Sequence, residues 1–295
     1  MYKTNPLYKI SSLKQLCKSL GIDVASYNEA IKNPYNTYYK IINSKKRLIE
    51  EPNDLLKGIL RKLLECLSVV ELPTYCYGLS KEHGTIENAR IHKNMAESLN
   101  FDISHYYPNT KSIYVEDFFK NKLKMSDEAL EAVIKMTTCN GHLSTGSPTS
   151  PILAFLSHEG IFNRIYQKMS ENDVNMSLYY DDLSFSANKH LGSWIYDYCK
   201  KSLKQHGLWI KTSKIKHFGY RGGWFTGVHV SQSGKLSAPH KLHYKVVKLL
   251  MSKPIKDMNE KELKSLIGTI AYLQQFDSKS FRVTKQVAQK ILSER

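Results

Sequence analysis

The chain has 295 residues, and 43 Lys or Arg against 27 Asp or Glu give it a formal net charge of +16 at pH 7. This length suffices for a buried core and for division into lobes, and the basic excess favours a polyanionic partner. Five widely spaced cysteines without a C-x-x-C pair, and the lack of any apolar run near 18 residues, argue against a disulfide framework, a zinc site and a membrane span. We therefore expect a cytoplasmic protein with reduced thiols.

The first 70 residues predict short helices, a basic hairpin and one longer helix. Helical stretches are expected near 12–20 and 26–33, before Pro34. Strand-like runs at 38–42 and 47–50 are separated by the turn 43–46, where basic residues could bind a triphosphate or simply be solvated. Apolar residues at helical spacing predict a core helix over 52–69, with Pro52 at its start.

A strand is expected over 99–107, where apolar and polar residues alternate until Pro108 stops it. Asp102 lies in this strand, and a buried carboxylate needs a partner because an unpaired charge in a core is costly. A helical run opens just before the strand, at Asn88. Its His92, taken alone, is more often a structural residue than a ligand.

Helices are predicted at 113–123 and 127–137, followed by a loop of small residues at 141–151. Ser150 and Pro151 mark the start of a further helix through about residue 166. Gly146 and Ser147 would let the backbone approach a planar or anionic group, although an ordinary loop before a capped helix explains them as well.

Two adjacent carboxylates, Asp181 and Asp182, lie between two strand-like runs within 178–186. Neighbouring side chains on a strand point to opposite faces, so both can reach one ion only if the chain turns there. With Asp102 as a third carboxylate, such a hairpin tip would suit two Mg²⁺ ions about 3.5–4 Å apart. Asp is also common in ordinary turns, and the pair alone leaves the two interpretations even.

The C-terminal third predicts a helix over 194–206 that ends at Gly207, then a glycine-punctuated hairpin over 218–230. Beyond Gly234 the composition changes to three lysine-rich helical patterns, at 239–252, 260–276 and 281–293. We therefore expect a boundary near 236 that separates a small helical lobe.

In this order the motifs resemble those of reverse transcriptases. The resemblance covers about 38–230: Phe101-Asp102-Ile103 with Tyr107, the loop 143–151, Tyr179-Tyr180-Asp181-Asp182, the segment from Gly207 to Lys214, and the hairpin 218–227. It implies an α+β right-hand polymerase, with fingers and palm in 1–235, a helical thumb in 236–295, and RNA-directed DNA polymerase activity.

The same resemblance implies roles for individual residues. Asp102, Asp181 and Asp182, with Ile103 as a further ligand, would hold two Mg²⁺ ions. Tyr107 would exclude a 2′-hydroxyl, and Lys214 would protonate or screen pyrophosphate. The full set expected to bind the deoxynucleoside triphosphate is Lys46, Arg47, Tyr107, Thr145, Gly146 and Lys214. Three residues depart from the usual pattern: Thr145 replaces Gln, Tyr180 replaces Ala, and Phe225 replaces Val.

A narrower resemblance is to bacterial retron reverse transcriptases, through Asn88-Ala89-x-x-His92 and Phe225-Thr226-Gly227. It implies a cognate structured RNA that serves as template and primer, a branched RNA–DNA product (msDNA), antiphage defence and an effector protein encoded nearby. RNA or primer contacts would come from Asn88, His92, Tyr180, Phe225, Thr226 and Gly227. The alternatives are another defence-associated reverse transcriptase without such an RNA, or an RNA–DNA-bound scaffold that restrains a toxic effector.

Overall fold

The computed structural model describes residues 2–42, 44–79 and 83–295, and the chain divides into two compact units. Unit 1 comprises Met1–Gly84, Leu99–Phe185 and Leu191–His217, and unit 2 comprises Thr85–Ser98, Ser186–His190 and Phe218–Arg295. The expected boundary near 236 therefore lies inside unit 2, and the division into 1–235 and 236–295 stays a prediction. Within the described ranges, no helix is long and apolar enough to cross a membrane.

Unit 1 begins with two short helices, a hairpin and a longer helix. Their bounds are α1 Leu13–Ser19, α2 Val24–Ala30, β1 Tyr35–Ile42, β2 Lys45–Pro52 and α3 Asp54–Leu67. Two details of the prediction were wrong. Pro52 ends β2 instead of starting α3, whose first turn is capped by the Asn53 side chain. Lys45 and Lys46 belong to β2 rather than to a four-residue turn, whose Asn43 lies outside the described residues.

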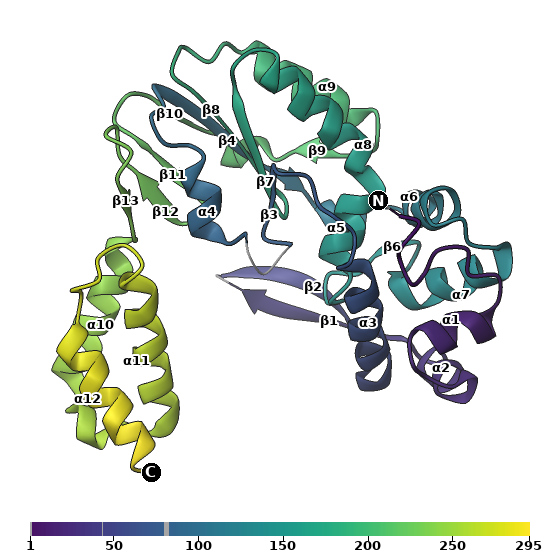
Figure 1. The fold of residues 1–295 in the computed structure, drawn as a ribbon, viewed down its shortest axis with the longest axis horizontal. Coiled ribbons are helices and arrows are strands. Elements are labelled where there is room, and N and C mark those ends of the chain that lie inside the picture. The colour runs from purple at the N-terminus through teal and green to yellow at the C-terminus, as the bar shows by residue number, and fades with distance from the viewer. Residues whose placement is uncertain (1, 43, 80–82) are drawn as a thin grey trace. The chain divides into compact units, whose positions relative to one another are not determined.

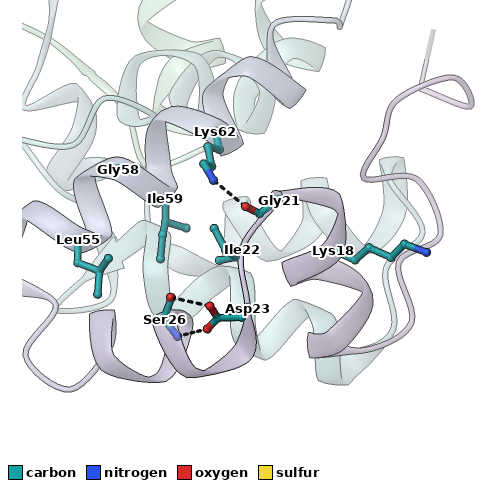
Figure 2. A pocket seen from close by; sticks show the side chains of 9 residues that line it. All are labelled: Lys18, Gly21, Ile22, Asp23, Ser26, Leu55, Gly58, Ile59 and Lys62. Atoms are coloured by element: carbon teal, nitrogen blue, oxygen red, sulfur yellow. Dashed lines mark hydrogen bonds between the residues drawn. The ribbon is translucent and has the colours of Figure 1, made fainter.

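A cavity of about 720 Å³ lies where α1 and α2 meet α3 (Figure 2). Its lining includes Ile22 from the connection between the two short helices and Leu55, Gly58 and Ile59 from α3. None of the residues that the sequence nominates for catalysis or nucleotide binding contributes to it.

Six described strands form the main sheet, in the order β10-β4-β8-β7-β3 with β9 also paired to β4 (Figure 1). Their bounds are β3 Cys76–Tyr77, β4 Glu97–Ser104, β7 Asn175–Tyr179, β8 Asp182–Ala187, β9 Trp209–Ile210 and β10 Lys216–Phe218. Strand β4, expected over 99–107, instead spans Glu97–Ser104. It ends at Ser104, because His105 adopts a left-handed φ of 46° and starts α5 (Tyr106–Asn109), which contains Pro108.

Helices pack around this sheet and supply most of the core of unit 1. Their bounds are α6 Ser112–Asp117, the π-helix η1 Phe118–Lys122, α7 Asp127–Thr137, α8 Ser150–Ser170, α9 Trp194–Lys204 and the 3-10 turn η2 Thr212–Lys214. A small hairpin, β5 Thr138–Cys139 with β6 His142–Leu143, precedes α8. Thr149, not Ser150, is the N-cap residue of α8, with Pro151 in its first turn.

Unit 2 combines a small sheet with helices. The bounds are α4 Thr85–Arg90, β11 Gly223–Phe225, β12 Val228–Val230, β13 Leu236–Ser237, α10 His240–Ser252, η3 Ile255–Asp257, α11 Glu260–Leu273 and α12 Arg282–Ser293. The three long helices α10, α11 and α12 lie together (Figure 1). Their core includes Val246, Leu266 and Ile270. Helix α4 packs with the hairpin β11–β12 in a second core, which includes Phe225 and Val228.

The five cysteines are free thiols, as expected from their spacing. Four of them are buried and Cys66 is partly exposed. Burial raises the pKa of every one, to about 11 for Cys139 and about 12 for Cys76. At neutral pH these groups are therefore protonated and poor nucleophiles.

Candidate active site

The predicted hairpin tip at the paired carboxylates is confirmed. Strand β7 ends at Tyr179 and β8 begins at Asp182, so Tyr180 and Asp181 form the connection. Tyr180 has a φ of 55°, in the left-handed region that is costly for a side chain of this size. The Ile103 N–H donates to the Asp181 carbonyl oxygen over 2.8 Å, which joins the tip to β4 beside Asp102.

Asp102 lies on β4, an interior strand of the sheet, and is only 9% exposed. Its backbone carbonyl accepts a 2.8 Å hydrogen bond from the Lys211 N–H. Its carboxylate pairs with the Lys214 ammonium, which η2 carries. Asp102 was expected to need a partner because it is buried, and Lys214 is that partner. The sequence had suggested a different role for Lys214, at the pyrophosphate.

Burial raises the pKa of the Asp181 carboxyl, against the effect of its own backbone and of the Arg47 and Lys211 charges. Burial also raises the pKa of Asp182 to about 6, and the neighbouring Asp181 adds to this, while Lys216 opposes it. Both groups thus hold their negative charge at a cost. A bound cation would offset that cost.

Within the described residues, no three Asp, Glu, His or Cys side chains converge on one point as a metal site requires. One of the three candidate carboxylates, Asp102, is paired with the Lys214 ammonium. The donor types fit a hard divalent cation, because carboxylate oxygens are the ligands that Mg²⁺ prefers. A magnesium site at Asp102, Ile103, Asp181 and Asp182 stays a prediction.

The two basic residues of β2 that are predicted to bind the triphosphate point to opposite faces of the hairpin β1–β2. Lys46 and Arg47 are adjacent on β2, so their side chains point to opposite faces. Burial is the main influence on the pKa of Asp181 and of Lys214, and the Arg47 charge lowers both, so Arg47 lies near enough to act on them electrostatically. The Lys46 ammonium instead lies 4.1 Å from the centre of the Tyr39 ring, on the other face.

Tyr107 follows β4 in the short helix α5 and is half-buried. Burial raises the pKa of its hydroxyl, and the nearby Asp181 and Tyr180 raise it further. Tyr107 therefore lies within electrostatic range of the carboxylate tip, where a residue that discriminates between sugars is expected. Its contact with a nucleotide stays a prediction.

Thr145 and Gly146 contact the edge of β2. The Thr145 hydroxyl bonds to backbone groups of Leu48 and Glu50, and a side chain at Gly146 would collide with the Glu50 carbonyl oxygen. Their predicted contact with the nucleotide is untested. The sequence had not nominated Glu50, whose side chain is 2% exposed despite its charge. The residue type gives no signal for this, because glutamates are usually solvated.

The residues predicted to bind RNA or primer, apart from Tyr180, form a separate cluster in unit 2. His92 stacks on Phe225 with ring centres 4.1 Å apart, and its Nδ1 lies 2.7 Å from the Ser186 hydroxyl. The Asn88 amide donates to the Thr226 hydroxyl over 3.1 Å. Burial lowers the pKa of His92 to about 3, so it is neutral. In this structure, His92 and Asn88 contact the hairpin whose turn is formed by Thr226 and Gly227. The RNA contacts of this cluster stay a prediction.

Comparison with known sequences found no matching family model. The chain is 27% identical over 190 residues, 62% of its length, to the retron Se72 reverse transcriptase of Salmonella heidelberg (strain 579083-10), of which it covers 50%. It is 22% identical over 213 residues, 66% of its length, to the retron Ec83 reverse transcriptase of Escherichia coli, of which it covers 64%. The chain thus spans about half to two thirds of the length of these relatives.

Among solved structures, the fold is similar to that of telomerase from Candida albicans in complex with a fragment of telomeric RNA. The TM-score is 0.52 at 12% identity, over 87% of this chain and 56% of the other. Apo telomerase from Candida tropicalis gives a TM-score of 0.51 at 10% identity, over 70% and 55% of the two chains. The predicted α+β polymerase fold is therefore confirmed, and in sequence the chain is similar to retron reverse transcriptases.

Proposed function

We propose that the chain is an RNA-directed DNA polymerase that uses a two-metal mechanism. The observation that carries this proposal is the hairpin tip, where Asp181 and Asp182 are joined by a backbone hydrogen bond to the strand of Asp102. Two carboxylates on the neighbouring strands β4 and β8 and a third in the turn before β8, two of them with raised pKa, are the arrangement expected where charge must be offset by ions and phosphates. The homology to retron reverse transcriptases supports the same chemistry.

Asp102, Asp181 and Asp182, with the carbonyl oxygen of Ile103, are the proposed Mg²⁺ ligands. Two ions bound there would activate the primer hydroxyl and neutralise the pyrophosphate leaving group. Arg47 would bind the triphosphate from the hairpin, and Tyr107 would exclude a 2′-hydroxyl by steric contact. Lys214 would leave Asp102 and donate its proton to the leaving oxygen. Burial and the neighbouring Arg47, Lys216 and Lys45 lower its pKa, which favours that proton transfer.

The finer part of the proposal is that template and primer come from one cognate structured RNA, that the product is a branched msDNA made from deoxynucleoside triphosphates, and that the system acts in antiphage defence with an effector encoded nearby. Homology to three retron reverse transcriptases supports this assignment. The net charge of +16 suits such a polyanionic partner. The cytoplasm is the proposed location.

The decisive experiment expresses the chain with its upstream genomic flank, as wild type and as the double variant Asp181→Ala/Asp182→Ala. Nucleic acid is extracted and examined for a short DNA whose size changes after RNase or debranching treatment. A branched species from the wild type alone supports both the polymerase and the retron product. Unbranched DNA keeps the polymerase but rejects the retron primer, and the absence of DNA from the wild type contradicts the proposal.

A further inference from the structure

The loop after β6 is attached to the outer edge of β2 by one side chain. The Thr145 hydroxyl donates to the Leu48 carbonyl oxygen over 3.0 Å and accepts from the Glu50 N–H over 3.3 Å. A carbonyl and the N–H two residues later point to the same edge of a strand, so this hydroxyl takes the place of a neighbouring strand. The hydroxyl gives hydrogen-bond partners to backbone groups at an edge of β2 that has no neighbouring strand in the two-stranded sheet β1–β2.

The next residue lets the loop lie directly against that edge. A Cβ added to Gly146 would lie 2.7 Å from the Glu50 carbonyl oxygen and 3.0 Å from the Glu51 Cα. Both obstacles are backbone atoms, which cannot move aside as a flexible side chain can. Gly146 is therefore needed for the close approach of two backbones, a separate requirement from the hydrogen bonds of Thr145.

The Glu50 side chain provides a third attachment between β2 and the segment 140–146. Its Oε1 accepts a 3.3 Å hydrogen bond from the Asn140 amide and lies 3.7 Å from the His142 Nε2. A carboxylate that is 2% exposed requires such partners, because burial without them is costly. Backbone, side chain and packing thus all fix β2 to this segment.

We propose that Thr145 is a positioning residue that acts through β2 on Arg47, rather than a residue that touches the nucleotide. Arg47 precedes Leu48, the residue that Thr145 holds, so an anchor there fixes the direction in which Arg47 leaves the strand. An isolated two-stranded hairpin is only marginally stable, which makes an external anchor effective. This inference rests on the proposed polymerase function, and it gives the unusual threonine at this position a specific role.

The test is a double-mutant cycle of Thr145→Val and Arg47→Ala, read as kcat and KM for the incoming deoxynucleotide. Loss of the hydroxyl alone is expected to raise KM about tenfold with little change in kcat, because nucleotide binding is weakened in ground and transition states alike. Thr145→Ser should restore most of the affinity. In the Arg47→Ala background, Thr145→Val should add no further effect. A full additive effect there, or no change in KM from Thr145→Val alone, would overturn the inference.

A second readout needs no catalysis. Hydrogen exchange at the Glu50 amide should accelerate in Thr145→Val, because its acceptor is lost, and an unchanged rate would also overturn the inference. Thr269→Val is the matched control: that hydroxyl bonds a carbonyl in α11 at 2.8 Å, and its loss should change neither the exchange at Glu50 nor KM. Wild-type protein that makes no DNA would defeat the proposed function, while the exchange measurement still decides whether the anchor exists.

Discussion

Two of the described hairpin tips have equal length but opposite character. In unit 2, Thr226 and Gly227 join β11 to β12, and their φ values of 46° and 86° match the turn that twisted hairpins prefer. Buried neighbours pack against this tip, including the stacked His92 and Phe225. In unit 1, the tip at Tyr180 and Asp181 has one left-handed tyrosine and carboxyls with raised pKa. The first tip is stabilised by packing, whereas the second stores unfavourable electrostatic energy, as expected of a functional site.

The largest expected effect tests the tip at Tyr180 and Asp181, which is the proposed catalytic one. Asp181→Ala should lower DNA synthesis by at least about 10³-fold, because it removes a proposed metal ligand that stabilises transition-state charge. Primer extension on a defined RNA template measures this. Asp127→Ala is the control, since the Asp127 side chain is 86% exposed and pairs with Lys120 at the surface. Equal activity of both variants would rule out the assigned role of Asp181.

The next effect tests the packed tip. Phe225→Ala should reduce the free energy of unfolding by about 3–5 kcal/mol, because it empties a fully buried site and removes the ring stacked on His92. Urea denaturation provides the measurement. Val283→Ala, at a side chain that is 71% exposed, should change the free energy of unfolding by less than about 0.5 kcal/mol. A cost at Phe225 as small as this would show that the cluster does not support the hairpin.

The pH dependence of stability should reveal the stored electrostatic energy. Because the folded protein raises the pKa of Asp182 to about 6, metal-free protein binds this proton more tightly than the unfolded chain does. Its free energy of unfolding should therefore fall as pH rises from about 4 to about 6 and then level off. Asp182→Asn should stabilise the protein at pH 8 by on the order of 1–3 kcal/mol. Urea titrations in EDTA measure both, and a variant less stable than wild type would contradict the argument.

The smallest expected effect isolates the backbone of the packed tip. A Cβ at Gly227 would meet nothing within 4 Å, so Gly227→Ala should destabilise the protein only through its positive φ, by about 1–2 kcal/mol. Gly58→Ala in α3 also enters open space, but at a helical position. It should stabilise by about 0.5–1 kcal/mol. Thermal unfolding of the pair checks this, and shifts of the same sign would refute the turn assignment.

Local chemistry made much of the fold predictable. Two adjacent aspartates that must share a site require a turn, and the long helices follow from their apolar spacing. Which face of a strand each side chain points to was harder to predict from the sequence. A four-residue turn at 43–46 leaves the directions of Lys46 and Arg47 undefined, whereas the observed pairing of Ile42 with Lys45 assigns them to opposite faces.

The residues that required the structure are those whose partners are distant in sequence. Thr145 bonds Leu48 across 97 positions, and Lys214 pairs with Asp102 across 112. Local patterns describe periodicity and turn chemistry, but they do not indicate which edge a hydroxyl will reach. The resemblance to reverse transcriptases suggested which residues matter, and packing then showed that Thr145 and Lys214 contact protein groups in this structure.

The protonated state of all five cysteines has a practical consequence for spectroscopy. Maleimide reagents attack thiolates, so the native thiols should react slowly and need not be removed before a label is attached. Ile41, which is 77% exposed in β1, is a suitable position for a single introduced cysteine. A fluorophore there would report how the hairpin moves as nucleotide binds, in a chain that otherwise keeps its natural sequence.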